Sequence, residues 1–385
     1  MRKLGLYLHV PFCRSKCLYC DFCSIPHADE ARMLAYTDAL CRDLIQRARD
    51  CRDCTVDTVY LGGGTPTVLP THALERILQT VFDSFCVSPT AEITSECNPA
   101  TADHASLLRM RRAGFNRLSI GLQSAHKQEL LALGRLHDFE DFRAVFCAAR
   151  EAGFDNLSAD VMFGIPHQST ESLLQTLEQL IKLSPEHISS YGLGIEEGTP
   201  FYRMRDRLPL PDEDEVCEMY RRGAELLDAH GYRQYEISNF AKAGYESRHN
   251  LKYWNCDEFL GFGPAAYSDF EGERFGYTRD VDAYIRGEAC FEERERPTLR
   301  QRANEYVMLR MRLGEGVLRR AFEERFGSPL DGMIGDAITP FVRRGLVEDT
   351  GAGYRFTREG LLLSNSVLSE LLDFSDADGE NEKNS

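Results

Sequence analysis

The chain has 385 residues, of which 43% are hydrophobic and 28% charged, a composition typical of a globular protein with room for one large domain and a smaller one. With 45 Lys and Arg against 61 Asp and Glu, its formal net charge of −16 argues against non-specific binding to nucleic acid. No stretch approaches the roughly 18 apolar residues that span a bilayer, and 13 cysteines without a signal-peptide pattern favour a reducing, cytoplasmic compartment.

The first predicted strand, Leu6–Val10, leads into a cysteine-rich loop. Cys13, Cys17 and Cys20 have the spacing C-x3-C-x2-C, and Cys23 follows three residues later. Three thiolates in one loop can hold three irons of a four-iron cluster and leave the fourth iron open for chemistry. The alternatives are buried structural thiols, a zinc site, or a cluster that Cys23 closes as fourth ligand, although zinc commonly takes two C-x2-C pairs.

Five more short apolar runs alternate with amphipathic helical patterns. These runs are Thr58–Leu61, Ala91–Thr94, Arg117–Leu122, Ser158–Phe163 and His187–Leu193. Six such strand–helix repeats predict an α/β fold with a parallel sheet and outer helices, a partial (β/α)6-type barrel over residues 1–239. In such barrels the active site lies at the carboxyl ends of the strands.

The distinctive residues of this region follow the predicted strands. Gly62–Thr65 come after the second strand and Glu96 after the third, while Gln123 ends the fourth and Asp160 lies in the fifth. Consecutive glycines let a backbone approach a ligand closely, and a carboxylate can accept hydrogen bonds from ribose hydroxyls or an ammonium group. Each of these residues alone could belong to a turn or a solvated loop, but their shared placement favours one site, together with Arg135.

Residues 240–296 are rich in Gly, aromatic and charged residues and predict a loop-rich connecting region. It contains the run Arg-His-Asn-Leu-Lys-Tyr-Trp at 248–254, with the only tryptophan of the chain. A lone histidine is usually structural, but His249 precedes two large aromatic residues. That combination could instead suit an iron porphyrin with the imidazole as axial ligand.

From Pro297 the pattern changes to helices at about 301–313, 317–326 and 332–344, then a short hairpin and a last helix to about residue 372. This order predicts a small winged-helix-like domain over residues 297–372. Such folds often bind DNA, but 11 Arg against 10 Asp and Glu give no excess of positive charge, so no nucleic-acid partner is expected. Residues 373–385 are polar and mostly acidic, which predicts a disordered tail.

With these residues in hand, the chain resembles the oxygen-independent coproporphyrinogen III oxidase-like family of radical SAM proteins. The shared motifs include Y-L-H-V-P-F-C at 7–13, G-G-G-T-P-T at 62–67, S-I-G-L-Q-S at 119–124, G-R-L-H at 134–137 and D-V-M-F-G-I-P at 160–166. Within the family, H-N-x-x-Y-W at 249–254 resembles the haem chaperone branch, the HemW type. The oxidase branch carries a fourth cysteine two residues after the third, where this chain has Phe22.

The resemblance implies that Cys13, Cys17 and Cys20 hold a [4Fe–4S] cluster whose fourth iron binds S-adenosylmethionine (SAM). It also implies a SAM site made of Tyr7, Tyr19, Gly63, Gly64, Thr65, Glu96, Gln123, Arg135 and Asp160. His249 is then expected to bind haem, with Asn250, Tyr253 and Trp254 nearby.

The function expected from the resemblance is a haem chaperone that passes haem to an acceptor haem protein, such as a respiratory, membrane-associated one. A flavodoxin or ferredoxin would supply electrons. The alternative is an oxygen-independent coproporphyrinogen III oxidase, an enzyme that oxidatively decarboxylates porphyrin propionates. The sequence leaves open whether SAM is turned over, whether haem attaches covalently, the oligomeric state and the role of Cys23.

Overall fold

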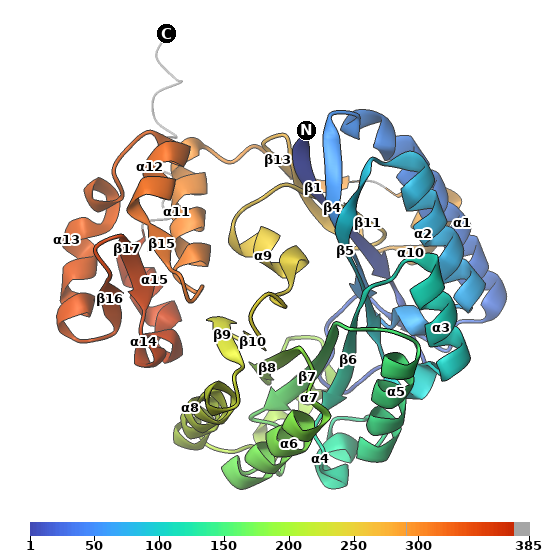
Figure 1. The fold of residues 1–385 in the computed structure, drawn as a ribbon, viewed down its shortest axis with the longest axis horizontal. Helices are drawn as coiled ribbons and strands as arrows, with labels where there is room; N and C mark the ends of the chain where they lie inside the picture. Colours follow the sequence, from blue (N-terminus) through green and yellow to red (C-terminus); the bar gives the residue numbers. More distant parts are fainter. Residues whose placement is uncertain (290, 373–385) are drawn as a thin grey trace. The chain divides into compact units, whose positions relative to one another are not determined.

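The computed structural model describes residues 1–289 and 291–372 (Figure 1), so the predicted disorder of residues 373–385 lies outside the described residues. The chain divides into two compact units. The first comprises Met1–Gln234, Ser238–Lys252 and Asp257–Glu295, and the second comprises Tyr235–Ile237, Tyr253–Cys256 and the chain from Arg296 onwards.

The first unit is built on the six predicted strands. They are β1 (Arg2–Val10), β4 (Cys54–Gly63), β5 (Val87–Cys97), β6 (Arg117–Gln123), β7 (Leu157–Phe163) and β8 (His187–Gly192). The strands pair in parallel and in chain order, which confirms the predicted α/β class and partial barrel. The carboxyl ends of all six therefore meet at one edge of the sheet.

Helices cover the convex face of this curved sheet (Figure 1). They include α1 (Glu30–Arg47), α2 (Thr71–Ser84), α3 (His104–Ala113), α4 (Lys127–Ala132), α5 (Phe139–Glu151) and α6 (Thr170–Leu183). The alternation of side chains along β1 shows why the two faces differ: Leu4, Leu6 and Leu8 are fully buried on one face, and Tyr7 and His9 occupy the other. Polar side chains therefore line the concave face, where the strands also carry their functional residues.

Residues 240–296 differ from the predicted loop-rich region, because much of this range is regular structure. It holds β11 (Phe259–Phe262), β12 (Tyr267–Phe270), β13 (Glu273–Tyr277), β14 (Phe291–Glu295), α9 (Arg248–Trp254) and α10 (Val281–Arg286). β11 pairs in parallel with β1, and β12 to β14 continue the sheet in antiparallel order. These strands have only four or five residues, too few for a clear alternating pattern in the sequence.

At the other edge of the sheet, β10 (Asn239–Ala241) pairs antiparallel with β8, and β9 (Arg233–Glu236) follows as the last strand. Helices α7 (Pro200–Met204) and α8 (Glu213–Ala229) connect β8 to this pair. Helix α9 lies on the concave side of the sheet, in contact with β4 and β5 (Figure 1).

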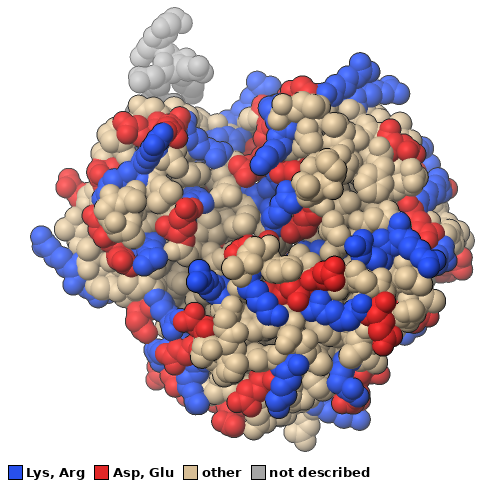
Figure 2. All heavy atoms as spheres, viewed as in Figure 1, with Lys and Arg blue, Asp and Glu red and all other residues tan. Residues whose placement is uncertain are grey.

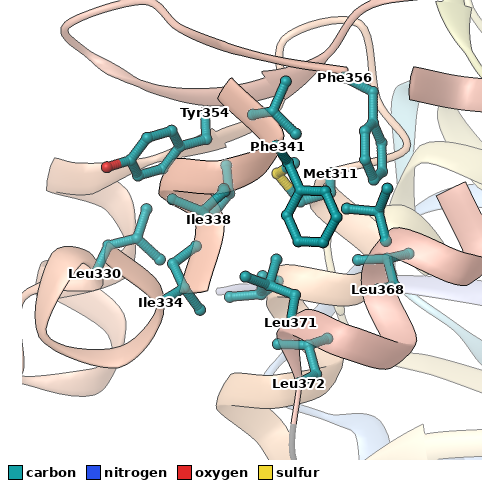
Figure 3. Packing of buried hydrophobic residues seen from close by; sticks show 14 of the residues in the cluster. Met311, Leu330, Ile334, Ile338, Phe341, Tyr354, Phe356, Leu368, Leu371 and Leu372 are labelled. Carbon is teal, nitrogen blue, oxygen red and sulfur yellow. The ribbon is translucent and has the colours of Figure 1, made fainter. Parts of the chain in front are cut away.

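The second unit has its own hydrophobic core. Its elements are α11 (Leu299–Arg310), β15 (Val317–Leu318), α12 (Arg319–Phe326), α13 (Leu330–Arg343), β16 (Val347–Asp349), β17 (Gly353–Phe356), α14 (Arg358–Leu362) and α15 (Ser364–Leu371). This helix, strand, helix, helix, hairpin order agrees with the predicted winged-helix-like domain. Val307, Met311 and Ile338 are fully buried in the core, which Figure 3 shows packing around α13 and α15.

Acidic and basic side chains are interspersed on the face shown in Figure 2. Within residues 1–289 and 291–372, no helix is both long enough and apolar enough to cross a membrane.

Candidate functional site

A cavity of about 520 Å³ opens at the carboxyl ends of the parallel strands. It brings together eleven of the twelve residues predicted for the cluster and SAM. They are Cys13, Cys17, Cys20, Tyr19, Gly63, Gly64, Thr65, Glu96, Gln123, Arg135 and Asp160. The three thiols form no disulfide bond and are partly exposed to the cavity.

Three contacts hold the cysteine loop in place. A two-stranded ladder of β2 (Phe12–Cys13) with β3 (Ile25–Pro26) brackets its two ends. The backbone of Leu18 bonds to Leu133 and Phe201 in the middle of the loop, at 3.2 and 3.0 Å. The Thr65 hydroxyl donates to Sγ of Cys13 at 3.6 Å, so the glycine-rich turn and the cysteine loop touch directly.

Cys23 points away from the three cysteines of the motif. Its Sγ donates to the backbone carbonyl of Arg279 at 3.4 Å, and its side chain does not line the cavity. Its own carbonyl lies 2.8 Å from Nε2 of His9. The geometry thus gives Cys23 a part in fixing the end of the loop and does not bring it to the other thiols.

The glycine turn after β4 allows close approach of neighbouring groups. Gly63 has φ +106°, and a Cβ there would lie 2.3 Å from the His9 ring. A Cβ on Gly62 would lie 2.8 Å from Oε1 of Glu96, and one on Gly64 would lie 2.6 Å from the Phe12 carbonyl. Side chains at these positions would therefore displace the groups that shape the cavity.

Of the four acidic side chains that line the cavity, Asp21, Glu96, Asp160 and Glu196, two lie on strands of the sheet, Glu96 on β5 and Asp160 on β7. Glu96 accepts hydrogen bonds from the Tyr60 hydroxyl and the Gly63 amide, both at 3.1 Å, and Asp160 accepts from the Ser119 hydroxyl at 3.0 Å. Desolvation, followed by the charge of Asp160, raises the pKa of Glu96 to about 7, and desolvation also raises the pKa of Asp160. Both carboxylates would be stabilised by a cationic ligand.

Arg135 also lines the cavity, and its Nη2 donates to the Tyr19 hydroxyl at 3.0 Å. Its buried Nε has no hydrogen-bond partner among the described residues, which marks a donor available to a ligand. Gln123 accepts from the Tyr191 hydroxyl at 3.0 Å. Tyr191 also lines the cavity, and sequence reasoning missed it, although its place two residues after Ser189 in β8 puts it on the concave face.

Tyr7 is the predicted SAM residue that does not line the cavity. Its hydroxyl lies 3.1 Å from Nδ1 of His9, and its ring stacks on Tyr60 with centroids 6.2 Å apart. Tyr7 thus lies behind the wall of the cavity, where it supports the ring whose hydroxyl bonds to Glu96.

The predicted haem ligand, His249, is buried inside the barrel. Its side chain is 1% exposed, its Nδ1 lies 2.8 Å from the Thr58 hydroxyl, and its ring stacks on Tyr60 at 5.3 Å and 25°. Desolvation, with the charges of Lys252 and Arg117, lowers its pKa to about 3, so the imidazole is neutral at pH 7. The structure therefore places His249 behind this cavity and not on an open surface.

Residues of β4 and β5 hold the rest of α9 in the barrel. Glu92 accepts hydrogen bonds from the amides of Arg248 and His249 at 3.1 and 3.0 Å, and Lys252 forms an ion pair with Asp57 at 2.7 Å. These two acidic residues, Asp57 and Glu92, lie within their strands and carry no sequence signal that would have identified them. Asn250 follows on the same helix, whereas Tyr253 and Trp254 are grouped with the second unit.

Comparisons with known proteins agree with this geometry. A model of the radical SAM superfamily matches residues 7–180, and one of the HemN C-terminal domain matches residues 298–363. A protein named heme chaperone HemW from Bacillus subtilis is 34% identical over 95% of this chain and 98% of its own length. The chain belongs to the HemW family of radical SAM proteins.

Two further relatives and a solved structure extend the comparison. Heme chaperone HemW of Escherichia coli is 34% identical over 96% of this chain and 98% of its own length. Radical S-adenosyl methionine domain-containing protein 1, mitochondrial, of Mus musculus is 32% identical over 96% and 87%. The solved coproporphyrinogen III oxidase HemN of Escherichia coli has a TM-score of 0.86 over 97% of this chain and 91% of its own, but at 23% identity it shows the fold alone.

Membership of this family implies a [4Fe–4S] cluster and SAM, and the residues of the cavity fit both. Three thiols outside any disulfide bond, an unpartnered guanidinium Nε and four carboxylates line the cavity. In the described part of the chain, no three Cys, His, Asp or Glu side chains converge as the ligands of one metal ion would. A four-iron cluster requires less convergence, because each of its irons takes a separate thiolate.

Proposed function

We propose that this protein is a haem chaperone that binds haem, carries a SAM-ligated [4Fe–4S] cluster and transfers haem to an acceptor haem protein. The observation that carries the proposal is the similarity to proteins named heme chaperone HemW, which extends over 95 to 96% of the chain. It therefore includes α9 and the C-terminal unit as well as the cavity. The acceptor, the electron donor and a cytoplasmic location are parts of this proposal that rest on the sequence.

In this proposal, Cys13, Cys17 and Cys20 hold the cluster, which together with SAM supplies one-electron chemistry. Glu96 and Asp160 would stabilise the positively charged groups of SAM, and the raised pKa values of both carboxyls show that a cation there would favour their ionised forms. Arg135 and Gln123, which line the same cavity, would donate hydrogen bonds to SAM.

His249 is the proposed axial ligand of the haem iron. Its neutral imidazole needs no proton removed before it binds iron. However, its 1% exposure means that α9 must leave the concave face before haem can reach the ring.

Haemin titration of wild-type and His249→Ala protein, followed by the Soret band, tests this role. Loss of the axial ligand should weaken haemin affinity about tenfold or more, which corresponds to about 1.4 kcal/mol, and should shift the Soret maximum. His230→Ala is the control, because His230 is an exposed histidine at the end of α8. Equal affinity and an identical spectrum for His249→Ala would remove His249 from the haem site.

The oxidase alternative is tested by chemistry. Anaerobic incubation of the cluster-loaded protein with dithionite, SAM and coproporphyrinogen III should yield no protoporphyrinogen if the protein only carries haem. Product in excess of one equivalent per chain would identify an enzyme and defeat the chaperone proposal.

A further inference from the structure

Tyr60, in β4, contacts both the wall of the SAM cavity and the buried helix α9. Its hydroxyl donates to Oε1 of Glu96 at 3.1 Å, and the same ring stacks on His249 at 5.3 Å. Neither Tyr60 nor His249 lines the cavity itself. A single side chain therefore joins a carboxylate that faces the cavity to the imidazole behind it.

The contact on the cavity side depends on what occupies the cavity. Glu96 has two acceptor oxygens, one bonded to Tyr60 and the other to the Gly63 amide at 3.1 Å. A cationic ligand in the cavity favours the ionised carboxylate, and an ionised acceptor forms the stronger hydrogen bond with a phenol. Binding of SAM should therefore tighten the bond that fixes the Tyr60 ring.

The contact on the other side decides whether His249 stays buried. Two tyrosine rings stack on the imidazole, Tyr60 at 25° and Tyr7 at 30° between ring planes, and the Thr58 hydroxyl meets Nδ1. A stacked tyrosine can hold the imidazole in place only if the tyrosine ring is itself fixed by other contacts. The position of the Tyr60 ring therefore influences how readily His249 leaves the barrel.

We propose that Tyr60 is a positioning residue through which SAM binding holds His249 inside the barrel and so weakens haem binding. The haem half of this inference rests on the proposed function, whereas the retention of α9 by SAM does not. Because coupling between two ligands is reciprocal, haem must weaken SAM binding by the same factor. According to this inference, SAM keeps the His249 ring buried, whereas haem draws it out of the barrel.

The first test follows α9 without haem. Amide hydrogen exchange of residues 248–254 is measured in cluster-loaded protein with and without saturating SAM, for wild type, Tyr60→Phe and the control Tyr232→Phe. Tyr232 is a buried tyrosine whose hydroxyl bonds to the Pro185 carbonyl at 2.9 Å, so the control deletes a comparable hydroxyl elsewhere. SAM should slow exchange about fivefold or more in wild type and Tyr232→Phe, and less than about twofold in Tyr60→Phe.

Equilibrium dialysis measures whether each variant still binds SAM. Equal slowing of exchange in Tyr60→Phe and wild type, or no slowing in wild type, would overturn the inference. Loss of SAM binding in Tyr60→Phe would overturn it too, since Tyr60 would then be part of the SAM site itself.

The second test adds haemin. SAM should raise the haemin dissociation constant of wild type about fivefold or more and leave that of Tyr60→Phe nearly unchanged. A haemin affinity that SAM leaves constant or strengthens in wild type would contradict the inference. Absence of haemin binding in wild type without SAM would instead contradict the proposed function, and the exchange experiment would still decide the role of Tyr60.

Discussion

Single histidines inside the barrel are kept neutral by their surroundings. Desolvation lowers the pKa of His249 to about 3 and that of His137 to about 4, and it also lowers the pKa of the fully buried His187. Each imidazole has a polar neighbour that accepts or donates one hydrogen bond, such as Thr58 for His249 and Ser158 for His187. Burial makes an added proton on such a ring unfavourable.

These pKa values predict a loss of stability in acid. Below the unfolded-state value of 6.5, His249 takes up a proton only when the chain unfolds, so stability falls as pH drops from 6.5 towards about 3. His249→Asn removes this one contribution. Between pH 6 and 4.5, the free energy of unfolding measured in urea should fall more steeply with decreasing pH in wild type than in the variant, by about 1.4 kcal/mol per pH unit. Parallel slopes would mean that His249 is charged in the folded protein.

Gly63 provides a second test at the scale of one residue. An added methyl group would meet the His9 ring in a backbone conformation with φ +106°. Gly63→Ala should therefore destabilise the protein by about 1–3 kcal/mol and disturb the cysteine loop, since His9 contacts the Cys23 carbonyl.

Gly332→Ala is the matched control for this substitution. Gly332 is an exposed residue within α13, where a methyl group meets nothing nearer than Cγ of Pro329 at 3.5 Å. There the same change should stabilise the helix by about 0.5–1 kcal/mol. Similar changes in melting temperature for the two variants would show that the contact with His9 does not determine the cost of a side chain at Gly63.

The sequence predicted most cavity residues because parallel strands bring their carboxyl ends together. Glu96 and Gln123 could be found from that rule alone. Glu92 and Thr58 could not, since a polar residue inside a strand is equally typical of a half-exposed sheet, and their partner on α9 lies more than 150 positions away. Only the curvature of the sheet brings Glu92 and Thr58 into contact with the same helix, α9.

At the scale of elements, α9 depends on the sheet around it. A helix of seven residues is too short to be stable alone, so its contacts must hold it in place. The Glu92 carboxylate satisfies two of its first amides, and the Lys252–Asp57 pair anchors its last turn at 2.7 Å. Both side chains of that pair are almost fully buried, at 5% and 12% exposed.

Breaking the buried pair should release α9. Asp57→Asn leaves the Lys252 ammonium without its carboxylate in a dry interior and should cost about 3–5 kcal/mol. The double variant Asp57→Leu with Lys252→Met removes both charges and should recover most of that loss. Urea unfolding of the single and double variants measures the difference. A double variant no more stable than Asp57→Asn would show that packing, and not charge, decides the cost.

The sequence missed β11 to β14 for a reason that also lies at this scale. A strand of four residues, such as Phe259–Phe262, shows only two alternations, and Gly261 interrupts them. The aromatic and glycine content that made residues 240–296 resemble loops is what lets short strands pack edge to edge. The longer predicted strands were correct because most of their residues are buried; β6, for example, is buried along its whole length.

At the scale of the whole molecule, each unit has a core of its own. The C-terminal core includes Phe322, Ile338 and Val367, all at most 2% exposed, and none of its members belongs to the barrel (Figure 3). On the face in Figure 2, charges of both signs are interspersed.

A core substitution should therefore act on one unit. Ile338→Ala should destabilise the C-terminal unit by about 2–5 kcal/mol. Hydrogen exchange should then quicken in residues 296–372 and stay unchanged in β4 to β7. Asp336→Ala, an exposed change on the same helix, should alter neither region. Faster exchange throughout β4 to β7 in Ile338→Ala would indicate that the two units unfold as one.

The pairing of β1 with β11 has a consequence for the order of events on the ribosome. Tyr7 of β1 pairs with Gly261 of β11, so β1 is translated long before its partner strand exists. At about 5–20 residues per second, translation of the intervening roughly 250 residues takes on the order of ten to fifty seconds. During that time the nascent β1 has β4 on one flank and bare amides on the other. His249 is translated in the same late stretch, so the pairing of β11 with β1 and the burial of the imidazole should occur together. A ribosome-stalled chain that ends near residue 240 should therefore be cleaved readily by proteases at its N-terminal strand.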